Sequence, residues 1–168
     1  MIGVAGLVMM IFSRFSRVKH ISKAVVGLGL LFLGLGYMKD SMMSLATMVD
    51  FSQYINFSVF FYFFVGFVVT LIMQSSTATI VLVLTAASSG IIGYHMGIPL
   101  IMGAFLGTTI TAVLGAIGPN PLKKQVAFSH VFFNLFSVIL GFIFLPVLVP
   151  FLNDWFPDIV FGLSVFAI

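Results

Sequence analysis

Three groups of polar side chains interrupt an otherwise apolar sequence, and each could bind an ion. The first group reads Gln-Ser-Ser-Thr-Ala-Thr over residues 74–79. A short helix that begins here would offer unpaired backbone N–H groups and the positive end of its dipole, which favour an anion. The hydroxyl and amide oxygens beside them suit a small, hard cation. The alternative is that these residues only cap the helix.

The second group is the threonine pair Thr108-Thr109, which lies within a glycine-rich stretch. Small residues recur there at spacing four in two adjacent ridges: Gly103, Gly107, Thr111 and Gly115, and Ala104, Thr108, Ala112 and Ala116. Such faces let membrane helices approach closely, and packing alone explains the glycines and alanines. Packing does not require two adjacent threonines, so we favour a functional role for them.

The third group is His130 with Asn134, which lie four residues apart and therefore on one helix face. His130 would lie about 9 Å from Lys124 along a helix, near the headgroups, whereas Asn134 would lie roughly 15 Å in. We therefore interpret Asn134 as an ion ligand or an inter-helix hydrogen bond, and His130 as an interfacial residue.

The composition places these groups in a lipid bilayer. Of 168 residues, 61% are hydrophobic and only 7% are charged, which no soluble domain of this size could tolerate on its surface. The absence of cysteine excludes disulfides, thiolate zinc sites and iron–sulfur clusters. No nucleophile–base–acid set occurs at one depth, so we expect neither an enzyme nor an organic cofactor. The net charge of +3 needs no nucleic-acid partner, because the basic residues lie mainly in two short segments.

The elements that position these groups are hydrophobic helices of a single transmembrane domain over residues 1–168. Two basic loops, residues 13–23 and 119–124, are expected in the cytoplasm, and residues 153–158 are expected outside. About five to six helices follow, with residues 1–12 as the tail of a span, full spans at 24–46, 97–118 and 125–152, and a further span starting at 159–168. Pro146 and Pro150 should bend the third full span.

Residues 57–89 do not fit two ordinary spans. A helix from Thr77 to Ser89 would have only about 13 residues and a length of roughly 20 Å, which is too short to cross. Polar backbone at membrane depth is tolerated only where protein or a water-filled cavity covers it. The pattern predicts a re-entrant helical hairpin or a broken helix.

The order of these motifs resembles the type II sodium-dependent phosphate cotransporter family over about residues 24–150. Gly-Leu-Leu-Phe-Leu-Gly at 29–34 opens the order, followed by Gln-Ser-Ser-Thr at 74–77, Gly-Ala-x-x-Gly-Thr-Thr at 103–109 and His-x-x-x-Asn at 130–134. The family carries a Gln-Ser-Ser-Ser sequence once in each of two inverted repeats, and this chain carries one copy. The chain looks most like the C-terminal half. It departs from the family at Phe105, where asparagine is usual.

The resemblance implies an all-α integral membrane protein that forms one half of an inverted-repeat transporter. It implies that Gln74, Ser75, Ser76 and Thr77 bind inorganic phosphate, and that Thr108, Thr109 and Asn134 coordinate the co-transported Na⁺. The expected function is sodium-coupled phosphate transport by alternating access in the plasma membrane, with a second repeat as partner or, secondarily, a homodimer. The alternative is a non-transporting membrane subunit, a helix-packing assembly module.

Overall fold

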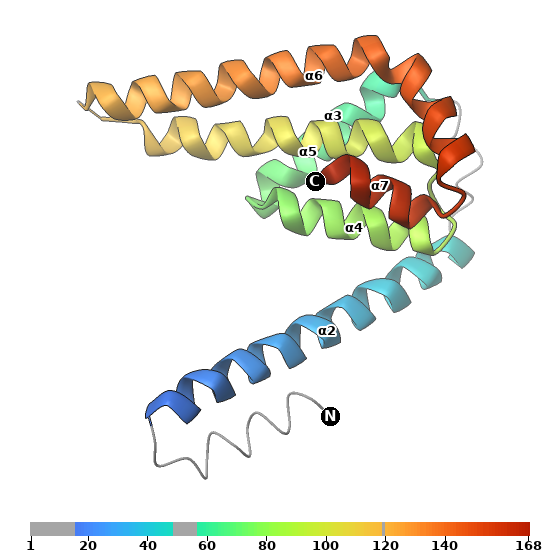
Figure 1. The fold of residues 1–168 in the computed structure, drawn as a ribbon, viewed down its shortest axis with the longest axis horizontal. Helices are drawn as coiled ribbons and strands as arrows, with labels where there is room; N and C mark the ends of the chain where they lie inside the picture. The colour runs from blue at the N-terminus through green and yellow to red at the C-terminus, as the bar shows by residue number, and fades with distance from the viewer. Residues whose placement is uncertain (1–15, 49–56, 119) are drawn as a thin grey trace. The chain divides into compact units, whose positions relative to one another are not determined.

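The structure, a computed structural model, describes residues 16–48, 57–118 and 120–168, and these residues form helices without strands. The predicted span tail at residues 1–12 lies outside this part. The helices are α2 (Ser16–Met48), α3 (Val59–Met73), α4 (Ser76–Ser88), α5 (Tyr94–Gly115), α6 (Pro121–Trp155) and α7 (Ile159–Ala167) (Figure 1). The predicted all-α membrane fold is confirmed, since three of the described helices are long and apolar enough to cross a bilayer.

The chain divides into two compact units, Met1–Ser44 and Leu45–Ile168. The first unit contains most of α2, and its stretch His20–Ser41 could cross a membrane. The prediction of a loop up to residue 23 was wrong, because α2 already begins at Ser16. Residues 16–23 contain neither glycine nor proline, and lysine and arginine are good helix formers, so the helix continues through this basic segment.

The second unit begins with two short helices. α3 has 15 residues and α4 has 13, which corresponds to lengths of about 22 Å and 20 Å. They are joined at Gln74 and Ser75, so the predicted break within residues 57–89 is confirmed.

Two longer helices follow the hairpin. α5 begins three residues earlier than predicted, and α6 extends beyond the predicted 125–152 at both ends. The early start of α6 has a local cause, because Asn120 caps the helix through its side chain and Pro121 occupies the first turn. At its other end α6 runs to Trp155, so residues 153–155 belong to the helix rather than to the predicted loop. α6 bends in its C-terminal part, where it contains Pro146 and Pro150 (Figure 1).

Glycines hold α3 and α5 in backbone contact. A methyl group on Gly66 would meet the Leu100 backbone, one on Gly103 would meet the Phe63 and Phe67 backbone, and one on Gly107 would meet Thr70: these contacts form the glycine seam. Residue numbers rise together along both helices, so α3 and α5 run parallel. The predicted small-residue ridge is used at Gly103 and Gly107, whereas Gly115 has open space around it.

The core of this unit surrounds the first half of α5, where Ile98, Ile101 and Ala104 are fully buried. The remaining helices close around it through further small residues. Leu163 of α7 packs on Gly97, and Met102 packs on Gly141 of α6. α6 contributes few buried side chains, so most of its large apolar surface is exposed to the surroundings of the bundle.

Candidate substrate and ion site

The turn between α3 and α4 is built by two residues of the Gln-Ser-Ser-Thr motif. Gln74 adopts a left-handed conformation with φ 52° and ψ 26°, and its N–H donates to the Thr70 carbonyl. This conformation ends α3 and reverses the chain. The Ser75 hydroxyl then accepts a hydrogen bond from the Ala78 N–H at 3.2 Å and caps α4. Helix capping therefore describes Ser75, but it does not account for the rest of the motif.

The other polar groups of the turn have no hydrogen-bond partner among the described residues. This holds for the Gln74 amide, for the hydroxyls of Ser76 and Thr77, and for the N–H groups of residues 75–77. Gln74 and Thr77 are exposed, and Ser76 is partly buried. Because an unsatisfied polar group in an apolar medium costs several kcal/mol, these groups require water, a protein partner or a ligand.

A buried threonine pair holds the turn together from behind. The Thr70 hydroxyl donates to the Thr79 hydroxyl at 2.8 Å, and the Thr79 hydroxyl donates to the Ser75 carbonyl at 3.1 Å. Each threonine is only 1% exposed. The pair fixes α3 against α4 and orients the cap, a positioning role that the sequence analysis did not assign to either residue.

The contacts of α3 give the depth of the turn along the bundle. Thr70 lies against Gly107, just past the middle of α5, and Gln74 follows one helical turn later. Because α3 and α5 run parallel, both helices of the hairpin open toward the N-terminal end of α5. The turn itself lies partway along α5 (Figure 1).

The predicted sodium ligands lie on α5 and α6. The hydroxyls of Thr108 and Thr109 donate to the carbonyls of Phe105 and Leu106, each at 2.7 Å. The Asn134 amide nitrogen donates to the His130 carbonyl at 3.0 Å. These bonds use donors only, so both hydroxyl oxygens and the Asn134 amide oxygen keep lone pairs for a cation.

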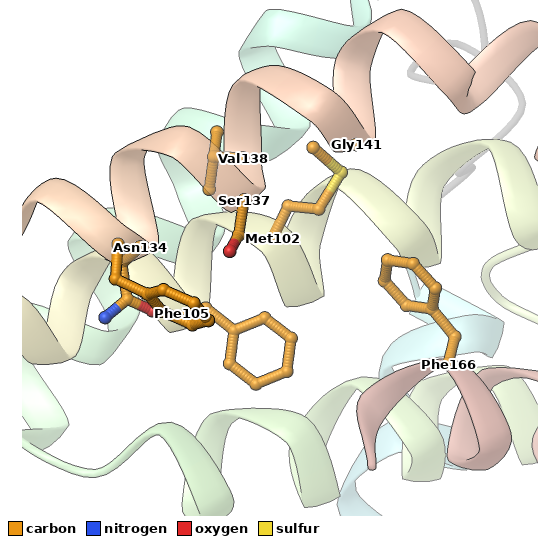
Figure 2. A pocket seen from close by; sticks show the side chains of 8 residues that line it. Met102, Phe105, Asn134, Ser137, Val138, Gly141 and Phe166 are labelled. Carbon is orange, nitrogen blue, oxygen red and sulfur yellow. The ribbon is translucent and has the colours of Figure 1, made fainter. Parts of the chain in front are cut away.

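A cavity of about 340 Å³ lies between α5, α6 and the end of α7 (Figure 2). Its lining residues are Met102, Phe105, Phe133, Asn134, Ser137, Val138, Gly141 and Phe166. Asn134 is therefore the one predicted ion ligand that borders this cavity. Residues 74–77, 108 and 109 do not line it, so the structure does not join the two predicted sets in this cavity.

Ser137 lies in this cavity beside Asn134 and was missed by the sequence analysis. Its hydroxyl points into the space between the aromatic side chains (Figure 2), and it has no hydrogen-bond partner among the described residues. The available signal was its spacing of three from Asn134 on a helix that is otherwise apolar at this depth.

The described residues contain no group of three or more histidine, aspartate or glutamate side chains that could hold a metal ion. The predicted cation ligands Thr108, Thr109 and Asn134 offer neutral hydroxyl and amide oxygens. Such oxygens match the preference of hard cations.

Comparison with known proteins identifies the family. The model of the Na⁺/Pi-cotransporter family matches residues 44–167. The chain belongs to this family. The match begins before the hairpin and ends with α7, so it covers all the helices of the second unit that the structure describes. The predicted family is confirmed.

Individual relatives agree with this assignment. The chain is 30% identical over 158 residues to "Uncharacterized protein YqeW" of Bacillus subtilis (strain 168), covering 92% of this chain and 51% of that protein. It is 33% identical over 88 residues to sodium-dependent phosphate transport protein 2A of Oryctolagus cuniculus, covering 49% of this chain and 14% of that protein. It is 37% identical over 82 residues to sodium-dependent phosphate transport protein 2B of Bos taurus, covering 46% of this chain and 12% of that protein. The chain thus spans about half of its bacterial relative and much less of the mammalian ones. No solved structure matches it.

Proposed function

We propose that this chain supplies one repeat of a transporter that couples the movement of inorganic phosphate to Na⁺ by alternating access. Membership in the Na⁺/Pi-cotransporter family supports this proposal. The observation that carries it is the turn at residues 74–77, where a broken hairpin presents unpaired N–H groups and hydroxyls within the bundle.

Phosphate would bind at the N-terminus of α4. The free N–H groups of residues 75–77 and the hydroxyls of Ser76 and Thr77 can donate to phosphate oxygens, and the helix dipole adds favourable potential. No lysine or arginine occurs between residues 40 and 122. The negative charge of phosphate would therefore be balanced by dipoles and by a bound cation.

Sodium would supply that cation. Thr108, Thr109 and Asn134 carry oxygens with free lone pairs on the two helices next to the hairpin. Because phosphate would lack a fixed positive partner, a bound Na⁺ would raise its affinity, and phosphate would raise the affinity for Na⁺ by the same factor. This reciprocity is the physical basis of coupled transport.

The chain would be a multi-pass protein of the plasma membrane, with the hairpin re-entering from the side opposite Lys123. A second repeat, with its own Gln-Ser-Ser sequence, would face the turn and cover its polar groups. Alternating access would then arise from the movement of one repeat against the other.

The test is sodium-dependent uptake of labelled phosphate into proteoliposomes. We expect Ser76→Ala to lower the apparent affinities for phosphate and for Na⁺ together by about tenfold or more, because a hydrogen bond to a charged group contributes about 1.5–3 kcal/mol. Ser75→Ala should do the same and also lose the helix cap, which costs about 1 kcal/mol of stability.

The matched control is Ser88→Ala at the other end of α4, where the exposed hydroxyl donates to the Thr85 carbonyl. This variant should transport like the unmodified protein. Normal uptake by both Ser75→Ala and Ser76→Ala would show that the turn does not bind phosphate.

The alternative is a non-transporting assembly module that packs against a partner. The exposed apolar surface of α6 favours it. The glycine seam weighs against it, because Gly103 and Gly107 already pack on α3 within the chain. A stable complex with no phosphate or sodium flux in any assembled form would favour the module.

A further inference from the structure

The middle of α6 has a polar stripe on one face. Between residues 130 and 150 its polar side chains are His130, Asn134 and Ser137. At about 100° per residue, the three lie within roughly 60° of one another. The opposite face at this level carries exposed apolar side chains such as Phe132, Ile139 and Ile143. The apolar face can contact lipid, whereas the polar stripe requires water or polar protein groups beside it.

Two cavities lie on the side of α6 that bears this stripe. The cavity of about 340 Å³ contains Asn134 and Ser137. A second cavity, of about 410 Å³, lies closer to the helix start and is lined by Lys123 and Ala127 of α6 together with Ala112 and Ala116 of α5. Lys123 lies seven residues before His130, which is about two helical turns and the same face. His130 therefore lies between the two cavities.

The two cavities lie along one groove between α5 and α6, and its α5 side repeats this arrangement. Phe105 borders the first cavity and Ala112 borders the second, seven residues later and on the same face. The turn of α5 between them carries Thr108 and Thr109, whose hydroxyl oxygens can still accept hydrogen bonds. These threonines line neither cavity, and Thr109 is only 4% exposed, so the polar side chains that recur along the groove are those of α6, over about 21 Å from Lys123 to Ser137.

The first cavity is large enough for water and has two polar residues in a mainly apolar lining. A water molecule occupies about 30 Å³ in the liquid and needs two to four polar partners, which limits buried water to polar sites. The cavity of about 340 Å³ offers the partnerless Ser137 hydroxyl and the Asn134 amide oxygen. Three aromatic rings, those of Phe105, Phe133 and Phe166, lie in the rest of its lining with Met102, Val138 and Gly141.

We infer that the groove between α5 and α6 is a water-filled half-path that leads from the Lys123 end to the middle of the bundle. The rings of Phe105 and Phe166 close its inner end. The groove carries small hydrated inorganic ions, and only this identity of the solute rests on the proposed function. Lys123 and Lys124 make the outer end basic, which attracts anions toward the opening.

Single cysteines can test the path directly, because the 168 residues contain none. Ser137→Cys and His130→Cys place thiols on the polar stripe. Ile139→Cys and Phe132→Cys are the matched controls at the same depth on the opposite face, where the native side chains are 50% and 63% exposed. The full protein, with any partner that co-purifies, is reconstituted in vesicles whose Lys123 side faces the bath.

The reagent is a membrane-impermeant cationic methanethiosulfonate, and the mass of this chain reports the modification. Only the thiolate reacts, and apolar surroundings suppress thiolate formation. A difference of one unit in thiol pKa changes the reactive fraction tenfold. We expect Ser137→Cys to react at least about tenfold faster than Ile139→Cys, and His130→Cys to exceed Phe132→Cys similarly. All four variants should react equally once denatured in dodecyl sulfate.

The closure is tested from the other side of the membrane. Reagent applied there should leave Ser137→Cys unmodified while Phe105 is present and should modify it in the double variant with Phe105→Ala. Modification with Phe105 in place would overturn the closure. If Ser137→Cys reacts no faster than Ile139→Cys in vesicles, lipid or a dry protein interface fills the groove and the path is wrong.

These outcomes are independent of phosphate uptake, because labelling needs no transport. A reactive groove in a protein that does not couple phosphate to Na⁺ would retain the path and reject the proposed solute. Normal coupled uptake with an unreactive groove would reject the path and retain the proposed function.

Discussion

Replacing Gly103 by alanine would place a methyl group inside the glycine seam between α3 and α5. The new carbon would lie 2.7 Å from the Phe67 backbone nitrogen, and the Phe63 carbonyl oxygen would be closer still. Ordinary contact begins at 3.4 Å, so the two helices would have to separate by about 0.7 Å or more. Neither obstacle is a side chain that could rotate away. The strain must therefore be distributed over both helices.

The magnitude follows from two opposing effects. Overpacking of this kind costs about 1–3 kcal/mol, and a backbone obstacle places Gly103→Ala at the upper end. Alanine regains up to about 1 kcal/mol through its higher helix propensity. Gly115→Ala, on the same helix with nothing within 4 Å, has only the gain. We therefore expect the two variants to differ by about 3 kcal/mol in the free energy of unfolding.

The assay is the fraction of protein that stays monodisperse in size-exclusion chromatography after heating in mild detergent. A difference of about 3 kcal/mol corresponds to roughly 6–12 °C between the two midpoints for a chain of this size. Gly107→Ala should fall between them, because its nearest obstacle is the Thr70 side chain at 2.7 Å. A midpoint for Gly103→Ala at or above that of Gly115→Ala would refute the close contact between α3 and α5.

Three further perturbations have expected outcomes. Thr79→Val removes the hydroxyl that joins the two hairpin helices and strands its partner on α3, so we expect a loss of about 1–3 kcal/mol in thermal stability; unchanged stability would show that the pair does not hold the turn. Tyr94→Phe removes a donor to the carbonyls of the turn between α6 and α7 and should lower the free energy of unfolding by about 1 kcal/mol. Hydrogen exchange should become faster in α7 and stay unchanged in α4. Asn120→Cys should be labelled only from the cytoplasmic side and Asn153→Cys only from outside. Outside labelling of Asn120→Cys would reverse the proposed topology.

Length and polarity were enough to predict the broken hairpin from sequence. Thirteen residues cannot span a bilayer, and the polar run at 74–79 had to interrupt the apolar text. The helix ends were less predictable. Clustered lysines and arginines predict loops, yet they are good helix formers, and Asn120 with Pro121 provides a helix start before Lys123.

The site was predicted only in part, because its geometry depends on contacts between distant segments. The spacing of Gly103 and Gly107 predicted a small face, but the partner surface at Gly66 is set by the register of α3 on α5. The pairing of Thr70 with Thr79 depends on the left-handed conformation of Gln74, which propensity alone does not indicate. The meeting of Phe105 with Ser137 likewise requires the α5–α6 register.

The glycine seam also determines which parts of the bundle can slide. Two backbones in direct contact resist shear steeply, since a shift along the seam brings neighbouring side chains of α3 onto the bare backbone at Gly103. The Thr70–Thr79 bond then ties α4 to the same block. α3, α4 and α5 would consequently travel as one stiff piece, and any stroke that opens the turn at residues 74–77 must take place at its outer surfaces. The sliding surface for such a motion would be the interface with α6, where α5 contacts Gly141 through the flexible side chain of Met102.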